Sequence, residues 1–387
     1  MKKDLLLKIS NYSYFLMMFF LPISLLLDNI FLIIMFLSII FNKKKAINNN
    51  NVLYYLLAFF LFTLVNGFLN NSFLVEKSNY IKLLPFIFIP FCLDNIENKI
   101  KLKGFVFLII GIIIIQLNSV YGIINYYYFT EGKKYALKNY SKINEILNYE
   151  RPYLGFFSAL SIVICFYYYS INKNKILSTI ISFFSLLLII VISARLAIVI
   201  VFFTSLIVIS KKLNKKNFIK TLIIFLGIIF LIFMSNSSLN DRFSQISKDA
   251  RVVTWKGANK LFFKNSNYIF GSGSEQKTRD NLLEHYKNYE EFGSEAEKNR
   301  FINKNYNTHN QYINELLRGG IIGLMLLLIP QVILLYSSFK KNNILELMFL
   351  VSIFSFCLVE NILDRQVGVY LYALLLSLTN IPYKVNE

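Results

Sequence analysis

Three ionisable residues stand at the ends of apolar segments, and their types suit phosphate and hydroxyl chemistry. Arg195 lies in Ser193-Ala194-Arg195 between two apolar stretches, Arg251 lies in a long polar stretch, and His309 directly precedes another apolar segment. A guanidinium group stays charged and matches phosphate oxygens two at a time. A neutral imidazole can act as a base towards a hydroxyl group. Because charges beside apolar segments are costly, such residues are functional candidates.

Each of the three also has a purely structural interpretation. Arg195 could be an interface anchor that extends to lipid headgroups, and Arg251 could be a solvated arginine. Arg251 and the single tryptophan, Trp255, share one face if this segment is an amphipathic helix, because four residues separate them. Gly271-Ser272-Gly273 follows and indicates an ordinary turn. The sequence leaves both interpretations open for each cation.

His309 is expected to be the first residue of a helix. Thr308, with Gln311 three residues later, is typical of a capping box, in which each residue satisfies backbone groups of the first turn. At that position the helix dipole would favour the neutral imidazole, and free backbone amides would attract an anion. The structural alternative is a polar residue that only begins the helix. The second histidine, His285, lies in the charged run 275–304 and is expected to face solvent.

The rest of the chain consists mainly of segments that could cross a membrane. The composition is 56% hydrophobic and 17% aromatic, with a mean hydropathy of +0.51, which is typical of a polytopic membrane protein. A membrane-spanning helix needs about 20 mostly apolar residues. The sequence therefore predicts an all-α fold with about twelve spans, at 12–27, 29–42, 52–69, 80–93, 104–128, 153–171, 176–193, 196–210, 221–235, 310–338, 344–362 and 367–382.

Charge places the segments relative to the membrane. Short loops that carry lysine and arginine stay cytoplasmic, and here the lysine-rich segments alternate with loops that hold only Lys77, Arg195 and Arg365. Both termini are therefore expected in the cytoplasm. The predicted organisation is spans 1–9 in residues 1–235, a long extracytoplasmic loop in 236–308 and spans 10–12 in 309–387. No cleaved signal peptide is expected, because the first apolar stretch lacks a small-residue cleavage site.

Several classes of function are disfavoured. The net charge of +19 is largely explained by the cytoplasmic loops and anionic lipid headgroups, so nucleic-acid binding is not expected. Cys92, Cys165 and Cys357 fall within predicted spans and indicate packing rather than a disulfide or metal site. The sequence has no nucleotide-binding glycine loop, paired-histidine zinc motif or nucleophile-elbow serine. Glu360 is expected to form a structural ion pair with Arg365 or Lys82 near Asp364.

Three motifs, in order, resemble the O-antigen ligases and O-antigen polymerases that assemble bacterial surface glycans. The detailed resemblance covers about residues 180–330, and the remaining chain resembles the family in its multi-span layout. Arg318 departs from the pattern, because many members carry an acidic residue before the glycine. The motifs are Ser193-Ala194-Arg195-Leu196-Ala197, Arg251-Val252-Val253-Thr254-Trp255 with Phe270-Gly271-Ser272-Gly273, and His309-Asn310-Gln311-Tyr312-Ile313 with Gly320-Ile321-Ile322-Gly323-Leu324.

The resemblance implies a metal-independent glycosyltransferase with no cofactor. It would transfer a glycan from a polyprenyl diphosphate to a hydroxyl of the lipid A core or of a lipid-linked glycan, at the outer face of the bacterial cytoplasmic membrane. Arg195 and Arg251 would bind the diphosphate, and His309 would orient or deprotonate the acceptor. The expected substrate-binding residues are Trp255, Asn310, Lys82 and Arg318. Membrane lipids are the other expected partners.

The sequence leaves the acceptor and the wider class open. A ligase passes the glycan to the lipid A core, whereas a polymerase passes it to another lipid-linked repeat unit, and the same donor chemistry serves both. A transporter or flippase of lipid-linked sugars also needs many spans, but internal repeats and midplane charges are typical of transporters and are not evident here. A membrane scaffold would leave the three candidate residues unrelated.

Overall fold

The chain is all-helical, as the sequence predicts. A computed structural model describes residues 2–42, 51–129, 143–171, 174–212, 250–264, 267–289, 292 and 294–379. These residues are 84% helical and contain no strand. The elements are α1 (Lys2–Phe20), α2 (Leu25–Asn42), α3 (Asn51–Leu69), α4 (Lys77–Leu83), α5 (Pro85–Asp94), α6 (Asn98–Phe129), α7 (Ile143–Ile146), α8 (Arg151–Ser170), α9 (Lys175–Val191), α10 (Arg195–Lys212), α13 (Ala250–Lys264), α14 (Glu275–Asn288), α15 (Glu295–Lys304), α16 (Gln311–Lys340), α17 (Ile344–Val359), the 3₁₀ turn η3 (Ile362–Asp364) and α18 (Gln366–Ser377).

Many of the helices suit a membrane. Among the described residues, five helices are long and apolar enough to cross one: Leu25–Asn42, Asn51–Leu69, Asn98–Tyr126, Arg151–Ser170 and Gln311–Lys340. Shorter apolar helices are Lys175–Val191, Arg195–Ser210, Ile344–Val359 and Gln366–Ser377. The predicted span 221–235 lies outside the described residues. The count of twelve and the sidedness of the loops therefore stay predictions.

Several of the predicted spans have different bounds in the structure. α1 starts at Lys2 and ends at Phe20, so the turn to α2 lies at 21–24 and not near residue 28. The predicted span 80–93 is divided into α4 and α5, with Pro85 at the start of α5. Proline suits the first turn of a helix but lacks the amide that a continuous helix would need. Hydropathy alone does not reveal such a division.

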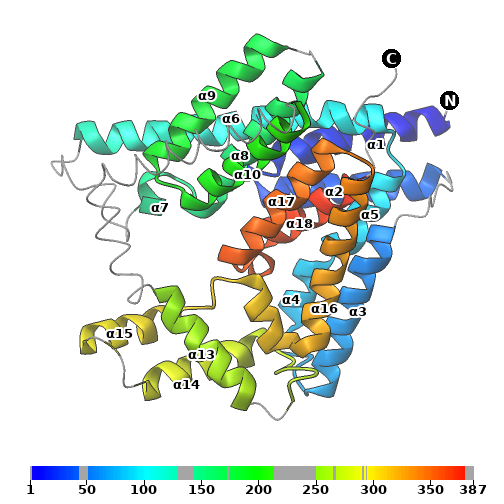
Figure 1. Ribbon diagram of the computed structural model, residues 1–387. Helices are drawn as coiled ribbons and strands as arrows, with labels where there is room; N and C mark the ends of the chain where they lie inside the picture. Colours follow the sequence, from blue (N-terminus) through cyan, green and yellow to red (C-terminus); the bar gives the residue numbers. More distant parts are fainter. Residues whose placement is uncertain are drawn as a thin grey trace.

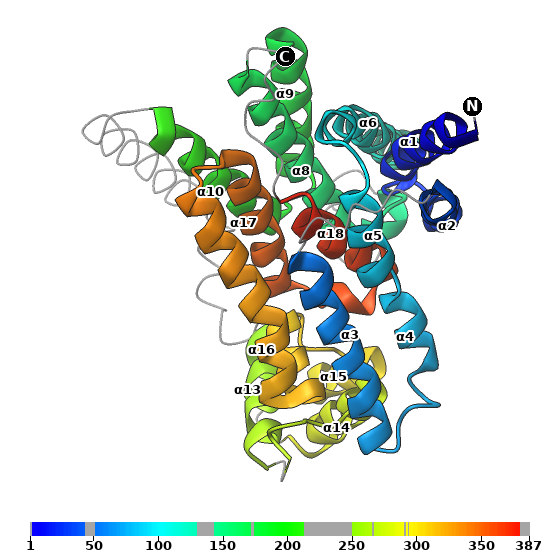
Figure 2. The ribbon, with the colours of Figure 1, turned by 90° about the vertical axis from the view of Figure 1, so that its right-hand side faces the viewer.

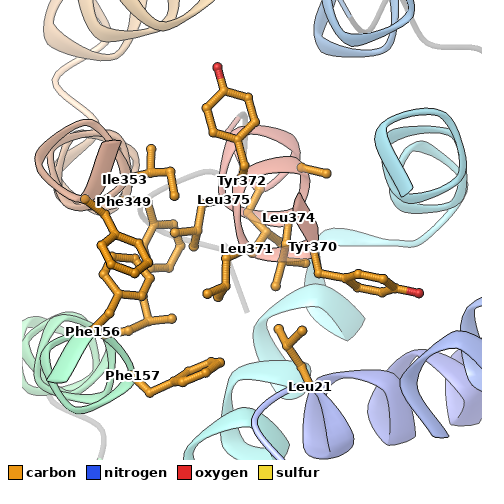
Figure 3. Close-up of a cluster of buried hydrophobic side chains, with 14 of the residues drawn as sticks. Leu21, Phe156, Phe157, Phe349, Ile353, Tyr370, Leu371, Tyr372, Leu374 and Leu375 are labelled. Carbon is orange, nitrogen blue, oxygen red and sulfur yellow. The ribbon is translucent and has the colours of Figure 1, made fainter. Parts of the chain in front are cut away.

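α18 lies at the centre of the membrane-type helices. Every residue from Gly368 to Ser377 is buried, and Figure 3 shows Phe156 and Phe157 of α8 and Phe349 and Ile353 of α17 on one side of it. A helix that is apolar on all sides is stable only when neighbours cover it on all sides. Peripheral helices differ, since Phe41 of α2 and Ile176 of α9 are 69% and 80% exposed. Such side chains suit contact with lipid.

The outer helices, α13, α14 and α15, form a second unit with its own apolar core. Leu282 and Tyr286 of α14 pack with Phe301 of α15, and Leu317 of α16 joins them. Figure 1 shows these three helices at one end of the molecule, away from α18. In Figure 2, α3 and α16 lie side by side and extend to this end. The described part of the polar stretch, from residue 250 onwards, is thus a folded unit attached to the membrane-type helices.

α16 is interrupted near its beginning. Gly320 has φ 63° and ψ −159°, which is not helical, and this backbone region is essentially restricted to glycine. The segment 267–273 fills the interruption, because Ile321 N and Ile322 N donate to the carbonyls of Tyr268 and Ile269. Ser272 N and Gly273 N donate in turn to Leu317 O and Arg318 O. The glycine turn therefore connects the outer helices to α16.

Candidate active site

His309 lies on a short segment, residues 307–310, that is fixed on both sides. Its backbone is left-handed, with φ 46°, and its amide donates to Asn307 Oδ1 over 3.1 Å. Asn361 Oδ1 accepts from Thr308 Oγ1 at 3.0 Å and from Asn310 N at 2.7 Å. A left-handed backbone is uncommon for residues other than glycine and costs free energy. The surrounding hydrogen bonds stabilise this conformation.

The His309 ring faces a carboxylate. Its Nδ1 lies 3.5 Å from Glu360 Oε2, and the two side chains are 30% and 20% exposed. The contact does not have the geometry of a hydrogen bond, and Nδ1 is buried without a hydrogen-bond partner among the described residues. A carboxylate in this position favours a proton on Nδ1, which leaves Nε2 available to accept another. The expected pairing of Glu360 with Arg365 or Lys82 is wrong.

The predicted capping box is also wrong. α16 begins at Gln311, and its N-cap is Asn310, whose side chain accepts from Tyr312 N and Ile313 N. Gln311 Oε1 instead accepts from Leu363 N. Asparagine is itself a strong N-cap residue, so Thr308 is not needed for this role and binds Asn361. His309 therefore precedes the helix, and its side chain is not part of the first helical turn.

α13 connects Arg251 to the His309 segment. Trp255 Nε1 donates to Thr308 O over 2.8 Å, so the helix lies against the residue that precedes His309. Arg251 is half-buried and lies one helical turn before Trp255, on the same face. The predicted helix around Arg251 is confirmed, with bounds at Ala250 and Lys264.

Arg195 begins α10 in a tight hairpin after α9. Ser193 in the turn has φ 51°, and Arg195 itself is exposed. α10 packs along α17, the helix that leads to Glu360, as both ribbon views show. A cavity of about 380 Å³ lies mainly between α8 and α9, and Val201 of α10 contributes to its lining beside Phe166 and Phe183. The cavity is lined mainly by apolar side chains from these three helices.

A charged cluster lies next to the His309 segment. Arg279 donates to Glu275 Oε1 and to Asp364 Oδ2, both at 3.1 Å, and Asn307 Nδ2 also donates to Asp364 at 3.2 Å. Lys82 Nζ donates to the Asp364 carbonyl oxygen at 3.3 Å. Burial, followed by the nearby Glu275 carboxylate, raises the pKa of Asp364 to about 7, although the neighbouring cations act in the opposite direction. Lys82 is thus already engaged with the backbone of η3.

Arg318 and Asn310 are also engaged within the protein. Arg318 Nη2 lies 2.7 Å from Glu315 Oε2, and the two side chains are 11% and 0% exposed. Asn310 caps α16 and donates through Nδ2 to Leu358 O at 3.0 Å. These contacts describe structural roles for two residues that were expected to bind substrate. A contact with substrate at either one stays a prediction.

The comparison with protein families bears on this part of the chain. Residues 146–328 match the family model described as O-antigen ligase. This segment is similar to the O-antigen ligase domain. No curated protein matches the chain. The matched segment contains Arg195, Arg251 and His309, and it extends the resemblance back to α8. The apolar helices indicate a membrane protein, and the matched segment is similar to a domain of glycan ligases and polymerases.

Two polar residues beside the His309 segment have contacts that the sequence does not predict. Glu360 and Asn361 follow α17, outside the matched segment, and both contact the His309 segment. Asn361 Nδ2 is buried and has no hydrogen-bond partner among the described residues. The run Glu360-Asn361-Ile362-Leu363-Asp364-Arg365 is the signal that points to them, because it is polar at the end of an apolar helix.

The environment of His285 also differs from the prediction. It does not face solvent freely but is half-buried between α13 and α14, where its ring packs against Gly257. A Cβ on Gly257 would lie 2.6 Å from His285 Cδ2, so the close approach of the two helices requires glycine. Burial, followed by the charge of Lys260, lowers the pKa of His285. In the described part of the charged run, α14 is therefore packed against α13, the helix that carries Arg251.

Proposed function

We propose that this chain is a membrane glycosyltransferase of the O-antigen ligase type. It transfers a glycan from a polyprenyl diphosphate to an acceptor hydroxyl at the outer face of the bacterial cytoplasmic membrane, during surface polysaccharide or lipopolysaccharide assembly. The observation that carries the proposal is the paired His309 and Glu360, on a segment bound by the helix that holds Arg251. The ligase-domain match gives the reaction class.

The bond changes follow from these residues. The acceptor oxygen attacks the anomeric carbon, and the bond from that carbon to the diphosphate oxygen breaks. The acceptor proton passes to His309 Nε2, while Glu360 stabilises the imidazolium that forms. The polyprenyl diphosphate leaves with the electron pair. Direct displacement inverts the configuration at the anomeric carbon.

The leaving group determines the role of the arginines. A departing diphosphate gains negative charge on its bridging oxygen, and fixed cations aimed at that charge stabilise the transition state. Arg251 and Arg195 supply this charge, so the proposal needs no divalent cation. The apolar cavity between α8 and α9 is a suitable place for part of the polyprenyl chain, since α10, which begins at Arg195, contributes to its lining.

The acceptor distinguishes two activities with this chemistry. A ligase uses the lipid A core, whereas a polymerase joins lipid-linked repeat units. The surface glycans of a deletion strain separate them. Long lipid-linked chains that accumulate indicate a ligase, and a single repeat unit on the core indicates a polymerase.

The test of the proposed function uses the full-length protein with single substitutions. His309→Ala and Arg251→Ala are expressed in the deletion strain, and surface glycan and membrane abundance are measured. Removal of a general base costs about 10²–10⁴-fold in rate, so surface glycan should be almost lost at normal abundance. Transfer by the purified wild-type protein should persist in EDTA. Full surface glycan with both variants would exclude the proposed site, and loss of transfer in EDTA would exclude the metal-free chemistry.

A further inference from the structure

A second cleft lies between α13 and α14, outside the candidate active site. Its volume is about 410 Å³, which is within the range of about 300–1,000 Å³ for small-molecule sites. Leu317 of α16 contributes an apolar wall. The polar side chains that line it and carry the argument are Lys260, Lys264, Asn281, Glu284, His285 and Asn288.

The cleft is formed by matching faces of the two helices. Lys260 and Lys264 lie four residues apart on α13, and Asn281, Glu284 and Asn288 repeat at helical spacing on α14. Leu282 and Tyr286 are fully buried in the core of the outer helices. The polar face of α14 is therefore held in place by the apolar face of the same helix.

The chemistry of the lining suits sugar hydroxyls. Each asparagine offers an amide donor and a carbonyl acceptor, the lysines donate and Glu284 accepts, so neighbouring hydroxyl groups can be bound in pairs. These lysines and asparagines and Glu284 are exposed. His285 has a lowered pKa, and its Nε2 is buried without a hydrogen-bond partner among the described residues. This atom lies against Gly257 of α13, so a water or ligand hydroxyl would have to enter between the two helices to satisfy it.

α13 joins the cleft to the candidate active site. Arg251 and Trp255 lie at its beginning, beside the His309 segment, and Lys260 and Lys264 lie towards its end. Nine residues separate Arg251 from Lys260, which corresponds to about 14 Å along a helix axis. This distance exceeds the reach of one sugar residue. A glycan whose reacting end is at Arg251 would therefore bring later sugars to the cleft.

We propose that the α13–α14 cleft binds sugar residues of the glycan several units away from the reacting anomeric carbon. The inference rests on the proposed function and names a second binding region for the same substrates. α13 would then set the distance between the diphosphate and the bound sugars. The bound glycan belongs either to the donor or to the acceptor, and the KM values for the two substrates distinguish these cases.

The first experiment measures transfer by full-length protein in lipid nanodiscs. The donor is the lipid-linked glycan extracted from cells that lack this chain, and the test variant is Asn281→Ala with Asn288→Ala. Its matched control is Asn259→Ala, an exposed asparagine of α13 that does not line the cleft. A second pair compares Lys260→Gln with Lys256→Gln. Thermal unfolding verifies that each variant is folded.

The cleft variants should raise one KM by at least about tenfold, equivalent to about 1.4 kcal/mol of binding, with kcat nearly unchanged. A higher KM for the donor alone assigns the cleft to the donor glycan. A higher KM for the acceptor alone assigns it to the acceptor glycan. Unchanged KM values for both, in variants that transfer glycan, would overturn the inference.

A second measurement does not depend on transfer. Glycan released from the lipid by mild acid is mixed with the purified protein, and binding is followed by saturation-transfer NMR. Binding to wild-type protein and to Asn259→Ala, with loss in the double variant, supports the cleft even if no transfer occurs. Equal binding to all three proteins would contradict it. If the wild-type protein binds glycan but transfers none, the proposed reaction is wrong and the proposal that the cleft binds glycan is retained.

Discussion

His309 is held at its position by its neighbours rather than by a helix. Its left-handed backbone is costly, by about 1–3 kcal/mol for a sparsely populated conformation. Hydrogen bonds to the side-chain oxygens of Asn307 and Asn361, and one from Trp255, fix the segment around it. The sequence identifies His309 as a candidate because it stands at the end of an apolar segment. It does not reveal Glu360, since 51 residues separate them and no local pattern pairs the two.

Glu360→Gln tests whether the carboxylate assists His309. The amide keeps the size of the side chain but cannot stabilise an imidazolium, so kcat should fall while KM for donor and acceptor stays constant. The fall should be smaller than the roughly 10²–10⁴-fold expected for His309→Ala, because the base itself remains. Steady-state transfer assays measure both. An unchanged kcat would mean that the contact is only structural.

Arg318 illustrates why residue type alone does not assign a role. An arginine near the end of a predicted span suits a substrate contact, yet its guanidinium is paired with the fully buried Glu315. Removing one partner of a buried ion pair costs about 3–5 kcal/mol, because the other charge remains buried. Arg318→Met should therefore lower the thermal midpoint, and Arg318→Met with Glu315→Gln should recover part of it. A normal midpoint with a higher substrate KM would instead support substrate binding.

At the scale of elements, hydropathy predicts most of the membrane-type helices and misses their interruptions. The apolar runs of α2, α3, α6, α8 and α16 are evident in the sequence, because their length and composition are enough to predict a membrane span. The interruption of α16 is not evident in the sequence, because Gly319-Gly320 lies at the start of a continuous apolar run. It exists because the segment 267–273, about 50 residues earlier, supplies the missing backbone partners. Such long-range pairing has no local signal.

Gly320→Ala tests the connection between α16 and the outer helices. Alanine is strained at φ 63° and ψ −159°, and its Cβ would collide with the Ile269 carbonyl group. We expect the thermal midpoint to fall and amide exchange in α13 and α14 to rise. Ile321→Ala, at a side chain that is 43% exposed, is the control and should change neither. An unaltered exchange pattern in Gly320→Ala would show that the outer helices are held by other contacts.

Across the whole molecule, polar contacts between residues far apart in the sequence help to attach the outer helices to the membrane-type helices. Glu76, between α3 and α4, accepts from Ser274 Oγ at 2.7 Å and from Gln276 N at 3.2 Å. Burial raises the pKa of Glu76, but these hydrogen bonds and one from Asn79 outweigh it, so the pKa lies below its usual value. The residues in these contacts are about 200 positions apart, which explains why the sequence predicts a polar loop but not its attachment.

Asp364 also connects the outer helices to the membrane-type helices, through its contact with Arg279. Its ionisation makes the stability of the molecule depend on pH. Its carboxyl group has a pKa of about 7 when folded, because of burial and the nearby Glu275, and about 3.9 in an unfolded chain. The folded state therefore binds the proton more tightly. The resulting stabilisation is fully present below about pH 4 and is lost as the pH rises through about 7.

The thermal midpoint of the wild-type protein should accordingly decrease between about pH 5 and pH 8. In Asp364→Asn this decrease should be smaller, because the amide cannot ionise. At high pH the same substitution also removes a charged partner of Arg279 and Asn307. Asp280→Asn is the matched control, since Asp280 is exposed on the same helix as Arg279. It should keep the wild-type profile. Parallel profiles for wild-type protein and Asp364→Asn would mean that Asp364 stays ionised throughout, with its cations outweighing its burial.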